Sequence, residues 1–513
     1  MSAKRKILSP KKYQVVLFTD FTDEVLTVKA LGAYKIASAL REQGYSCLVV
    51  DKLSQWTLEE ITSLVNLAVG QETLFVGFST TFLKNLDRID NLFFGYAPNL
   101  SIFPQGKDFE NSVIKEIHKL SPDCKILLGG HKINQDCANK NVNIVVRGLA
   151  EQAIMDVANS LSNKTEIPNS YRNIHGVTVV HRDQEKTYDF ANSAMHWQAS
   201  DILNYRVLPF EPARGCIFNC RFCSFPQRGK KTLDYVLTEE IIYNELQSNY
   251  DRFGITTYQL LDDTFNDSDH KLDRMLSVVK QLSFQPVFWS YNRLDLLATK
   301  PERIKKLFDI GLRATSFGIE TLKKETGLVV GKGFDAARQI QTVKDIKKTY
   351  GNNLLMHGLF IIGLPHETLE EVQHTFDLID SGEFPLHSAY FEALMIAKPN
   401  QYFLQSDFDK KWPEYGYRDL GSEGQGILNW ANDHMNFDQA REKKTELVTR
   451  LQQSSRYHIP GQTAWALMNY NNFTLDRVQN LKNIEIDWQE VKDSKQAFVT
   501  EYKQKMLAFL ATN

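Results

Sequence analysis

The sequence predicts an α/β protein with two parallel sheets, followed by a mostly helical C-terminal region. Two observations carry this prediction. In the first 160 residues, short and continuously apolar strands alternate with helices, which is typical of a doubly wound parallel sheet covered on both faces. Between residues 207 and 400, six strand–helix units follow one another, with polar residues at the carboxyl end of each strand. Such a repeat predicts a partial (β/α)6 barrel whose site lies on that face.

The N-terminal sheet is expected to contain about five strands. A helix should begin near Leu31 and end at Gly44, a residue suited to a helix C-terminus. Thr57 and Glu60 have the spacing of a capping box and should open the next helix. Sheets of this kind bind ligands at the carboxyl ends of their strands. The expected strands cover residues 13–19, 47–51, 74–79, 125–129 and 143–147.

Four segments are predicted along the chain. Residues 1–160 form the doubly wound domain, and residues 161–206 form a linker with a hairpin over 176–181 and 186–188. Residues 207–400 form the barrel, and residues 401–513 form a helical region on the substrate side. The barrel strands are expected from residue 207 and at 255–261, 287–291, 313–319, 354–362 and 388–396.

Composition excludes several classes of protein. The net charge of −2 gives no general attraction to nucleic acid or to an anionic membrane. No apolar run approaches the roughly 18 residues that span a bilayer, and no secretory signal follows the basic first residues. We therefore expect a cytoplasmic protein with no nucleic-acid or membrane partner, in a reducing compartment that suits free thiols.

Three of the six cysteines lie within eight positions. Cys216, Cys220 and Cys223 have the spacing C-x3-C-x2-C, and Phe222 precedes the last of them. Three thiolates on one loop can hold three irons of a four-iron cluster and leave the fourth iron open. A disulfide is excluded because the number is odd and the spacing is tight. A structural zinc site, which usually needs four ligands, remains the alternative.

This cysteine loop resembles that of the radical S-adenosylmethionine (SAM) enzymes, whose open iron binds SAM. Three later segments resemble the same family: residues 261–265, 316–321 and 360–368. The resemblance implies contacts to the amino group, carboxylate, ribose and adenine of SAM. The implied SAM-binding residues are Asp262, Asp263, Arg293, Glu320, Gly363 and Glu367. Each residue taken singly could instead be a helix cap, a surface carboxylate or part of a turn.

The first 160 residues resemble the cobalamin-binding domain that precedes many radical SAM barrels. The resemblance lies in residues 31–45, 128–131 and 146–151. No histidine has an aspartate two positions before it, so a lower axial ligand from a D-x-H-x-x-G motif is not expected. The alternative is that these are ordinary turn and cap residues. The implied cobalamin-binding residues are Ser79, Thr80, Thr81, Gly129, Gly130, Gly148 and Glu151.

The resemblance implies an enzyme that cleaves SAM at a [4Fe–4S] cluster to form a 5′-deoxyadenosyl radical. With cobalamin bound, it implies methylation of an unactivated carbon, fed by an electron donor such as flavodoxin or ferredoxin. Hydrogen-atom abstraction needs no protein base, so no catalytic side chain is predicted. Two alternatives stay open: a radical SAM cyclase or rearrangement enzyme that does not use cobalamin for methyl transfer, and a non-catalytic iron–sulfur or cobalamin sensor. The P-G-T segment that many relatives show is replaced here by residues 397–400, which leaves the architecture on the substrate side open. The substrate is not predicted, because a shared fold does not select one.

Overall fold

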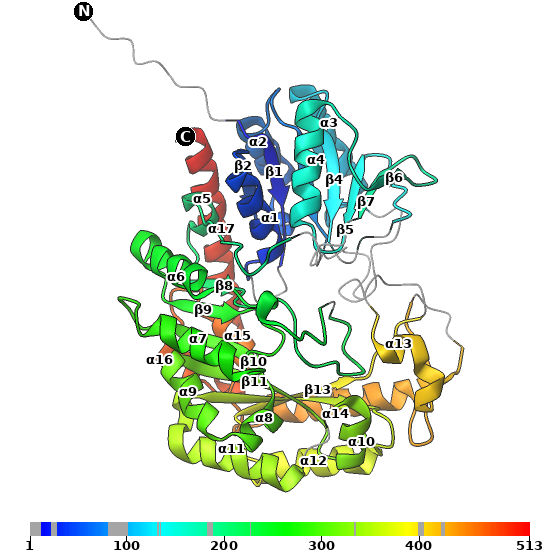
Figure 1. Cartoon of the computed structure of the whole chain (residues 1–513), viewed down its shortest axis with the longest axis vertical. Helices are drawn as coiled ribbons and strands as arrows, with labels where there is room; N and C mark the ends of the chain where they lie inside the picture. Colours follow the sequence, from blue (N-terminus) through cyan, green and yellow to red (C-terminus); the bar gives the residue numbers. More distant parts are fainter. Residues whose placement is uncertain are drawn as a thin grey trace, which may run out of the picture. The chain divides into compact units, whose positions relative to one another are not determined.

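The computed structural model describes residues 12–21, 28–80, 101–130, 133, 135–181, 188–225, 227–332, 335–398, 405–421 and 426–512. The chain forms two compact units (Figure 1). The first contains Met1–Tyr188, Ala194–Tyr205 and Lys495–Asn513, and the second contains Asp189–Ser193 and Arg206–Ser494.

The first unit is built on a seven-stranded sheet. Its order is β2-β1-β3-β4-β5-β7-β6, and all neighbouring strands are parallel except β6 and β7. The five strands expected from the sequence are confirmed. The strands are β1 (Val15–Phe18), β2 (Cys47–Val50), β3 (Phe75–Ser79), β4 (Lys125–Gly129), β5 (Ile144–Arg147), β6 (Ser170–Arg172) and β7 (Thr178–His181).

Helices cover this sheet in two pairs, α1 with α4 and α2 with α3. Because the chain steps from β1 to β2 in one direction and from β2 to β3 in the other, right-handed crossovers place α1 and α2 on opposite faces. Thr57 and Glu60 form the expected capping box at the start of α2. The helices are α1 (Leu31–Glu42), α2 (Leu58–Ala68), α3 (Lys107–Leu120), α4 (Glu151–Asn163) and the short α5 (Ala199–Ile202).

Two features of the first unit differ from the sequence prediction. A hairpin forms between β7 and the preceding β6, and β7 also continues the parallel sheet beside β5. Of the predicted second strand over 186–188, residues 186 and 187 lie outside the described residues. The last helix, α17 (Trp488–Thr512), contributes its residues from Lys495 onward to this unit. The Tyr502 hydroxyl accepts from the backbone N–H of Asp51 at 2.8 Å, because the helix packs against the end of β2.

The second unit is built on six parallel strands in sequential order, β8 to β13, and confirms the predicted partial barrel. The strands are β8 (Val207–Phe210), β9 (Thr257–Leu260), β10 (Val287–Asn292), β11 (Leu312–Glu320), β12 (Leu355–Ile362) and β13 (Ser388–Ala393). The helices between them are α6 (Glu239–Phe253), α7 (Asp269–Val279), α8 (Leu294–Thr299), α9 (Glu302–Ile310), α10 (Lys324–Val330), α11 (Ala336–Tyr350) and α12 (Leu369–Ser381).

The chain after β13 is mostly helical, as predicted. A two-stranded ribbon, β14 (Arg418–Asp419) with β15 (Trp430–Ala431), interrupts it. Its helices are α13 (Asp407–Lys411), α14 (Phe437–Gln453), α15 (Gly461–Leu467) and α16 (Leu475–Asn480), ahead of α17. Within the described ranges, no helix combines the length and apolarity that crossing a membrane requires.

Candidate functional site

The cysteine loop leaves β8 and closes on itself through backbone hydrogen bonds. Cys216 N–H donates to the Gln227 carbonyl at 2.9 Å, and Lys230 N–H donates back to the Cys216 carbonyl at 3.0 Å. Gly215 makes this closure possible: its φ is +125°, and a Cβ there would lie 2.7 Å from the Gln227 oxygen. The loop therefore has a fixed shape at the carboxyl end of the first barrel strand.

The three loop thiols suit an iron–sulfur cluster better than a single metal ion. All three are free, with Cys216 and Cys220 buried and Cys223 partly exposed. In the part of the chain that the structure describes, no three His, Cys, Asp or Glu side chains converge as one metal ion requires. A zinc site needs such convergence, whereas each cysteine of a cluster binds a different iron. Three thiols on one loop are the donor set that a [4Fe–4S] cluster with one open iron needs, and the described residues show no fourth ligand for zinc beside them.

Arg293 follows β10 and reaches the cysteine loop. Its Nη1 lies 3.4 Å from the sulfur of Cys220, and its guanidinium stacks on Phe218 with 4.0 Å from Cζ to the ring centroid. Nε and Nη2 both donate to the carboxylate of Asp295, at 3.0 and 2.5 Å. The family resemblance places Arg293 near the SAM carboxylate, and in this structure Asp295 binds the Nε and Nη2 side of its guanidinium.

The two adjacent aspartates after β9 have different surroundings. Asp262 is fully enclosed and pairs with Lys271 at 2.9 Å, and Lys271 also pairs with Asp267 at 3.0 Å. Asp262 additionally accepts from the backbone N–H of Thr264 at 2.9 Å. The Asp263 carboxylate is half-buried, and burial together with the neighbouring Asp262 raises its pKa to about 7. Asp262 therefore stabilises the loop through its ion pair, while the Asp263 carboxylate is the more exposed of the two.

Glu320 ends β11 in a left-handed backbone conformation, with φ of +68°. The strand is irregular at this point, where its pairing with β12 shifts between Gly318 and Glu320. The carboxylate binds the ammonium of Lys332 at 2.6 Å, and the same ammonium donates to the Gly318 carbonyl at 2.5 Å. A side chain at Gly318 would collide with this pair, because its Cβ would lie 2.8 Å from Oε1 of Glu320.

Glu367 and Gly363 follow β12, and both lie in enclosed surroundings. The Thr321 hydroxyl donates to Oε1 of Glu367 at 2.5 Å, and burial raises the pKa of this glutamate to about 8. Oε2 of Glu367 is buried and has no hydrogen-bond partner among the described residues. The Gly363 carbonyl accepts from the Tyr417 hydroxyl at 2.8 Å, and Trp430 covers its α-carbon.

The expected cobalamin-binding residues lie at the carboxyl ends of β3, β4 and β5 in the first unit. Ser79 pairs with Gly129, and the Thr80 hydroxyl donates to the Gly129 carbonyl at 2.9 Å. Gly130 and Gly148 have φ values of +123° and +79°. Glu151 is buried in the first turn of α4, and Thr81 lies outside the described residues. These residues gather at the carboxyl ends of the strands, where parallel sheets bind ligands.

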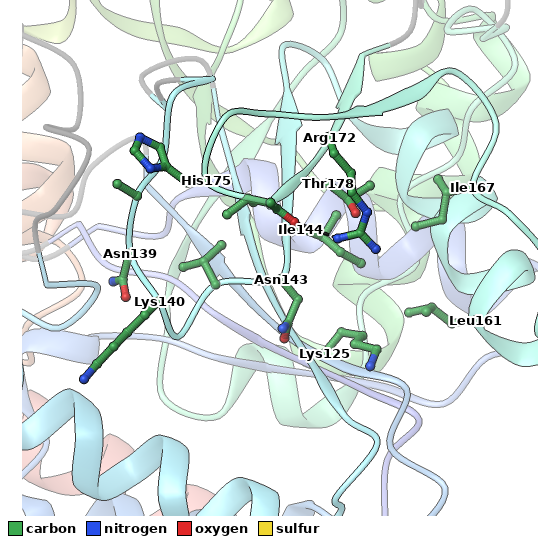
Figure 2. Close-up of a pocket in the computed structure, with 14 residues that line it drawn as sticks. Lys125, Asn139, Lys140, Asn143, Ile144, Leu161, Ile167, Arg172, His175 and Thr178 are labelled. Atoms are coloured by element: carbon green, nitrogen blue, oxygen red, sulfur yellow. Dashed lines mark hydrogen bonds between the residues drawn. The ribbon is translucent and has the colours of Figure 1, made fainter.

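A separate cavity of about 530 Å³ lies at the amino-terminal ends of strands in the same sheet (Figure 2). Lys125, Ile144 and Thr178 line it, and they are the first residues of β4, β5 and β7. Arg172 donates from Nη1 to the Gly176 carbonyl at 2.7 Å along its rim. None of the cofactor-binding or metal-binding residues predicted from the sequence lines this cavity.

Comparison with known families bears directly on the cysteine loop. Residues 210–379 match the sequence model of the radical SAM superfamily. The chain carries a radical SAM domain. The match begins at the end of β8 and includes the cysteine loop and the ends of β9 to β12. This domain implies a [4Fe–4S] cluster and SAM, as the sequence resemblance predicted.

Three individual relatives are similar to this chain. An uncharacterised methyltransferase of Pyrococcus horikoshii is 27% identical over 268 residues, which cover 48% of this chain and 56% of the relative. The bacteriochlorophyllide d C-8(2)-methyltransferase of Chlorobaculum tepidum is 24% identical over 269 residues, with 50% and 56% covered. The aligned part thus spans little more than half the length of each curated relative.

The third is a solved structure, the radical SAM methyltransferase TsrM of Kitasatospora setae with cobalamin and a [4Fe–4S] cluster bound. It matches at a TM-score of 0.60 and 13% identity, covering 95% of this chain and 99% of TsrM. At this identity the likeness is one of fold, and it extends over both units. The fold class predicted from the sequence is therefore confirmed.

Four residues around the site were missed by sequence reasoning: Lys271, Asp295, Lys332 and Thr264. Each contacts a residue that was predicted. Asp295 and Thr264 stand two positions from Arg293 and Asp262, so polar residues next to a predicted ligand were an available signal. Lys271 lies in α7 and Lys332 follows α10, and no local pattern indicates their partners.

Proposed function

We propose that this chain is a radical SAM enzyme that cleaves SAM reductively at a [4Fe–4S] cluster held by Cys216, Cys220 and Cys223. One observation carries the proposal: three free thiols lie on a closed loop at the carboxyl end of β8, within the radical SAM domain. When bound, the cluster would pass one electron to the SAM sulfonium, which yields methionine and a 5′-deoxyadenosyl radical. An external electron donor of the flavodoxin or ferredoxin class would supply that electron.

The protein's own groups would bind and orient SAM. We assign the amino group to Asp263, because its carboxylate is the more available of the two aspartates and a cation would favour its charged form. Asp262 holds the ammonium of Lys271 in place, and the positive charge of Lys271 favours the charged form of the Asp263 carboxylate. The ribose is assigned to Glu320, whose carboxylate Lys332 holds in place. The adenine is assigned to the segment from Gly363 to Glu367 at the end of β12.

We propose further that the first unit binds cobalamin and that the reaction is methylation of an unactivated carbon. Two relatives are named methyltransferases, and TsrM has cobalamin bound in the same fold. In this chain, Ser79, Thr80, Gly129, Gly130, Gly148 and Glu151 are the candidate contacts, with Thr81 beside them in sequence. Bound cobalamin would supply the methyl group to a substrate radical.

The first experiment loads the purified protein with iron and sulfide under anaerobic conditions, then adds SAM and dithionite. We expect the absorbance and iron content of a [4Fe–4S] cluster and formation of 5′-deoxyadenosine. Cys220→Ala should lose both, while Cys124→Ala, which alters a buried thiol outside the loop, should retain both. A wild-type protein that takes up no iron, or a Cys220→Ala variant that still cleaves SAM, would show that the cluster has been misplaced.

A second experiment separates methyl transfer from the alternatives. Protein loaded with both cluster and hydroxocobalamin should retain the corrinoid absorbance after gel filtration. SAM carrying a deuterated methyl group should then transfer that label to a candidate substrate. SAM cleavage without corrinoid uptake would favour a cyclase or rearrangement enzyme, and cluster loading without any SAM cleavage would favour a sensor.

A further inference from the structure

The guanidinium of Arg293 is fixed against the sulfur of Cys220. The Nη1–Sγ distance is 3.4 Å, and the Arg293 side chain is only 7% exposed. An N–H group at this distance from sulfur is a hydrogen-bond donor, and here the donor also carries a positive charge. The contact therefore links a buried cation to one of the three proposed cluster ligands.

Four contacts hold the guanidinium in this position. Asp295 accepts from Nε and Nη2, and the Gly331 carbonyl accepts from Nη2 at 3.4 Å. The ring of Phe218 lies under the guanidinium plane. The backbone of Arg293 is tied to Asn266 in both directions, at 2.8 and 2.9 Å. Because these contacts act from several directions, the side chain cannot swing away without breaking most of them.

The donors of Arg293 are almost fully used. A guanidinium has five N–H groups, and the contacts above use four of them. The remaining Nη1 hydrogen could reach a carboxylate only singly. The Asp295 side of the fork is the side that a bidentate carboxylate would need, so the arrangement favours the thiol contact over a SAM clamp.

Other groups also approach a loop sulfur. The backbone N–H of Phe218 donates to the sulfur of Cys216 at 3.5 Å and carries no net charge. The contact with the side chain of Thr264 is weaker than that of Arg293. The sulfur of Cys216 lies 3.4 Å from Oγ1 of Thr264, but that hydroxyl already donates to the Asp263 carbonyl at 2.7 Å. Its single hydrogen cannot serve both acceptors at once. Among the residues that the structure describes, Arg293 is therefore the side chain whose N–H group donates a hydrogen bond to a loop sulfur.

We propose that Arg293 donates a hydrogen bond to the Cys220 thiolate and raises the reduction potential of the cluster. The inference rests on the proposed function, because it requires the cluster to be bound by the three cysteines. Hydrogen bonds to cluster sulfurs and nearby positive charge stabilise the reduced, more negative state. Asp295 is then a positioning residue, which acts on the cluster only through Arg293.

The test is a potentiometric titration of the reconstituted full-length protein, followed by electron paramagnetic resonance of the reduced cluster in the absence of SAM. Arg293→Met should lower the reduced-to-oxidised ratio at a fixed potential about tenfold, which is about 59 mV for a one-electron couple. Arg41→Met is the matched control, since Arg41 is 6% exposed and pairs with a carboxylate, Asp201, at 2.6 Å. Its potential should equal that of the wild type.

Arg293→Lys separates the effect of the hydrogen bond from the effect of the positive charge. It also provides a second variant if Arg293→Met does not bind the iron–sulfur cluster. Lysine keeps the charge but not the fixed fork, so its potential should fall between those of the wild type and Arg293→Met. Asp295→Glu keeps the negative charge but shifts the bidentate anchor of the guanidinium by one methylene, so it should lower the potential by a smaller amount. A wild-type potential in Arg293→Lys would overturn the hydrogen bond. A wild-type protein that loads no cluster would instead refute the proposed function.

Discussion

The backbone of Gly363 lies directly against the indole ring of Trp430. A Cβ at position 363 would lie 2.3 Å from Cη2 of the indole, which is shorter than any real contact. The ring cannot retreat easily, because its Nε1 donates to the Leu394 carbonyl at 2.7 Å and the side chain is fully buried. The end of β12 is thus closed by a residue from the C-terminal region.

Gly363→Ala should therefore destabilise the second unit. The new methyl group would displace Trp430, and the residue would also have to keep a φ of +98°. Together these effects should cost about 2–4 kcal/mol. We expect a clearly lower melting temperature, measured by differential scanning calorimetry of the protein without added cofactors.

Gly416→Ala is the matched control for this prediction. Gly416 has a similar φ of +82°, but nothing lies within 4 Å of the Cβ that it would gain. Its cost should be the backbone strain alone, about 1–2 kcal/mol. Equal losses in the two variants would mean that Trp430 gives way without cost and that the contact is not tight.

The adjacent aspartates after β9 should respond differently to removal of their charge. Asp262→Asn takes one of two carboxylates from the buried Lys271, so it should cost about 1–3 kcal/mol in stability. Asp263→Asn removes no pairing partner and should melt like the wild type. If Asp263 binds the SAM amino group, its variant should bind SAM about tenfold more weakly or worse, through loss of a charge-assisted bond.

Melting curves and anaerobic equilibrium dialysis with SAM check both halves of this prediction. Thr232→Val is a suitable control, since it removes only an exposed hydroxyl contact to Asp234 at the surface. If Asp263→Asn lost as much stability as Asp262→Asn, the two carboxylates would share one structural role, and the assignment of SAM to Asp263 would be wrong.

Local sequence patterns were sufficient to place the strands and their ends. Parallel strands have continuous apolar runs that stop at polar residues, so Asp262, Glu320 and Glu367 could be assigned to one edge of the barrel. The six sequential strands confirm that placement. The roles of these residues toward SAM remain predictions, since they depend on a ligand.

Contacts between distant segments could not be predicted in the same way. Trp430 meets Gly363 across 67 positions, and Tyr502 meets Asp51 across 451. Lys271 pairs with Asp262 from inside α7, where a lysine would ordinarily face solvent. Such contacts arise when whole helices and strands pack together. The periodicity of apolar residues in the sequence does not indicate which helix or strand packs against which.

Asp51 is expected to be essential for the stability of the first unit. Its Oδ2 accepts from the hydroxyls of Tyr34 and Tyr205, at 3.1 and 2.8 Å, and lies 3.8 Å from the ammonium of Lys29. Both charged side chains are fully buried, and burial lowers the pKa of Lys29 to about 8. Asp51→Asn leaves this lysine without its counter-charge and should cost about 3–5 kcal/mol.

The double variant Asp51→Asn/Lys29→Met tests the cause of that loss. Removing Lys29 also removes one of the two buried lysines that Asp51 balances, the other being Lys52, so part of the stability should return. Melting temperatures of the two single variants and the double variant complete the cycle. A double variant less stable than Asp51→Asn would show that hydrogen bonding to the tyrosines, and not charge balance, is the main contribution of Asp51.

Acid should destabilise the second unit through His458. This histidine is buried, its Nε2 lies 2.6 Å from the ammonium of Lys482, and His387 with its own partner Lys347 lies on the other side. Burial, and then these two lysines, lower the pKa of His458 from 6.5 to about 4. Protonation would place a third cation among them, and no carboxylate hydrogen-bonds to either imidazole among the contacts of the described residues.

A folded pKa below the unfolded value means that the unfolded chain takes up the proton first. Stability from His458 is therefore complete above pH 6.5 and is lost as the pH falls towards 4, by up to about 1.4 kcal/mol per pH unit. His458→Gln, whose amide oxygen can still accept from Lys482, should flatten the fall in melting temperature between pH 6.5 and 5. His374→Gln, at an exposed position of α12, should leave it unchanged. An equally steep fall in His458→Gln would assign the acid sensitivity to other groups, because the proton uptake at position 458 would then contribute nothing to unfolding.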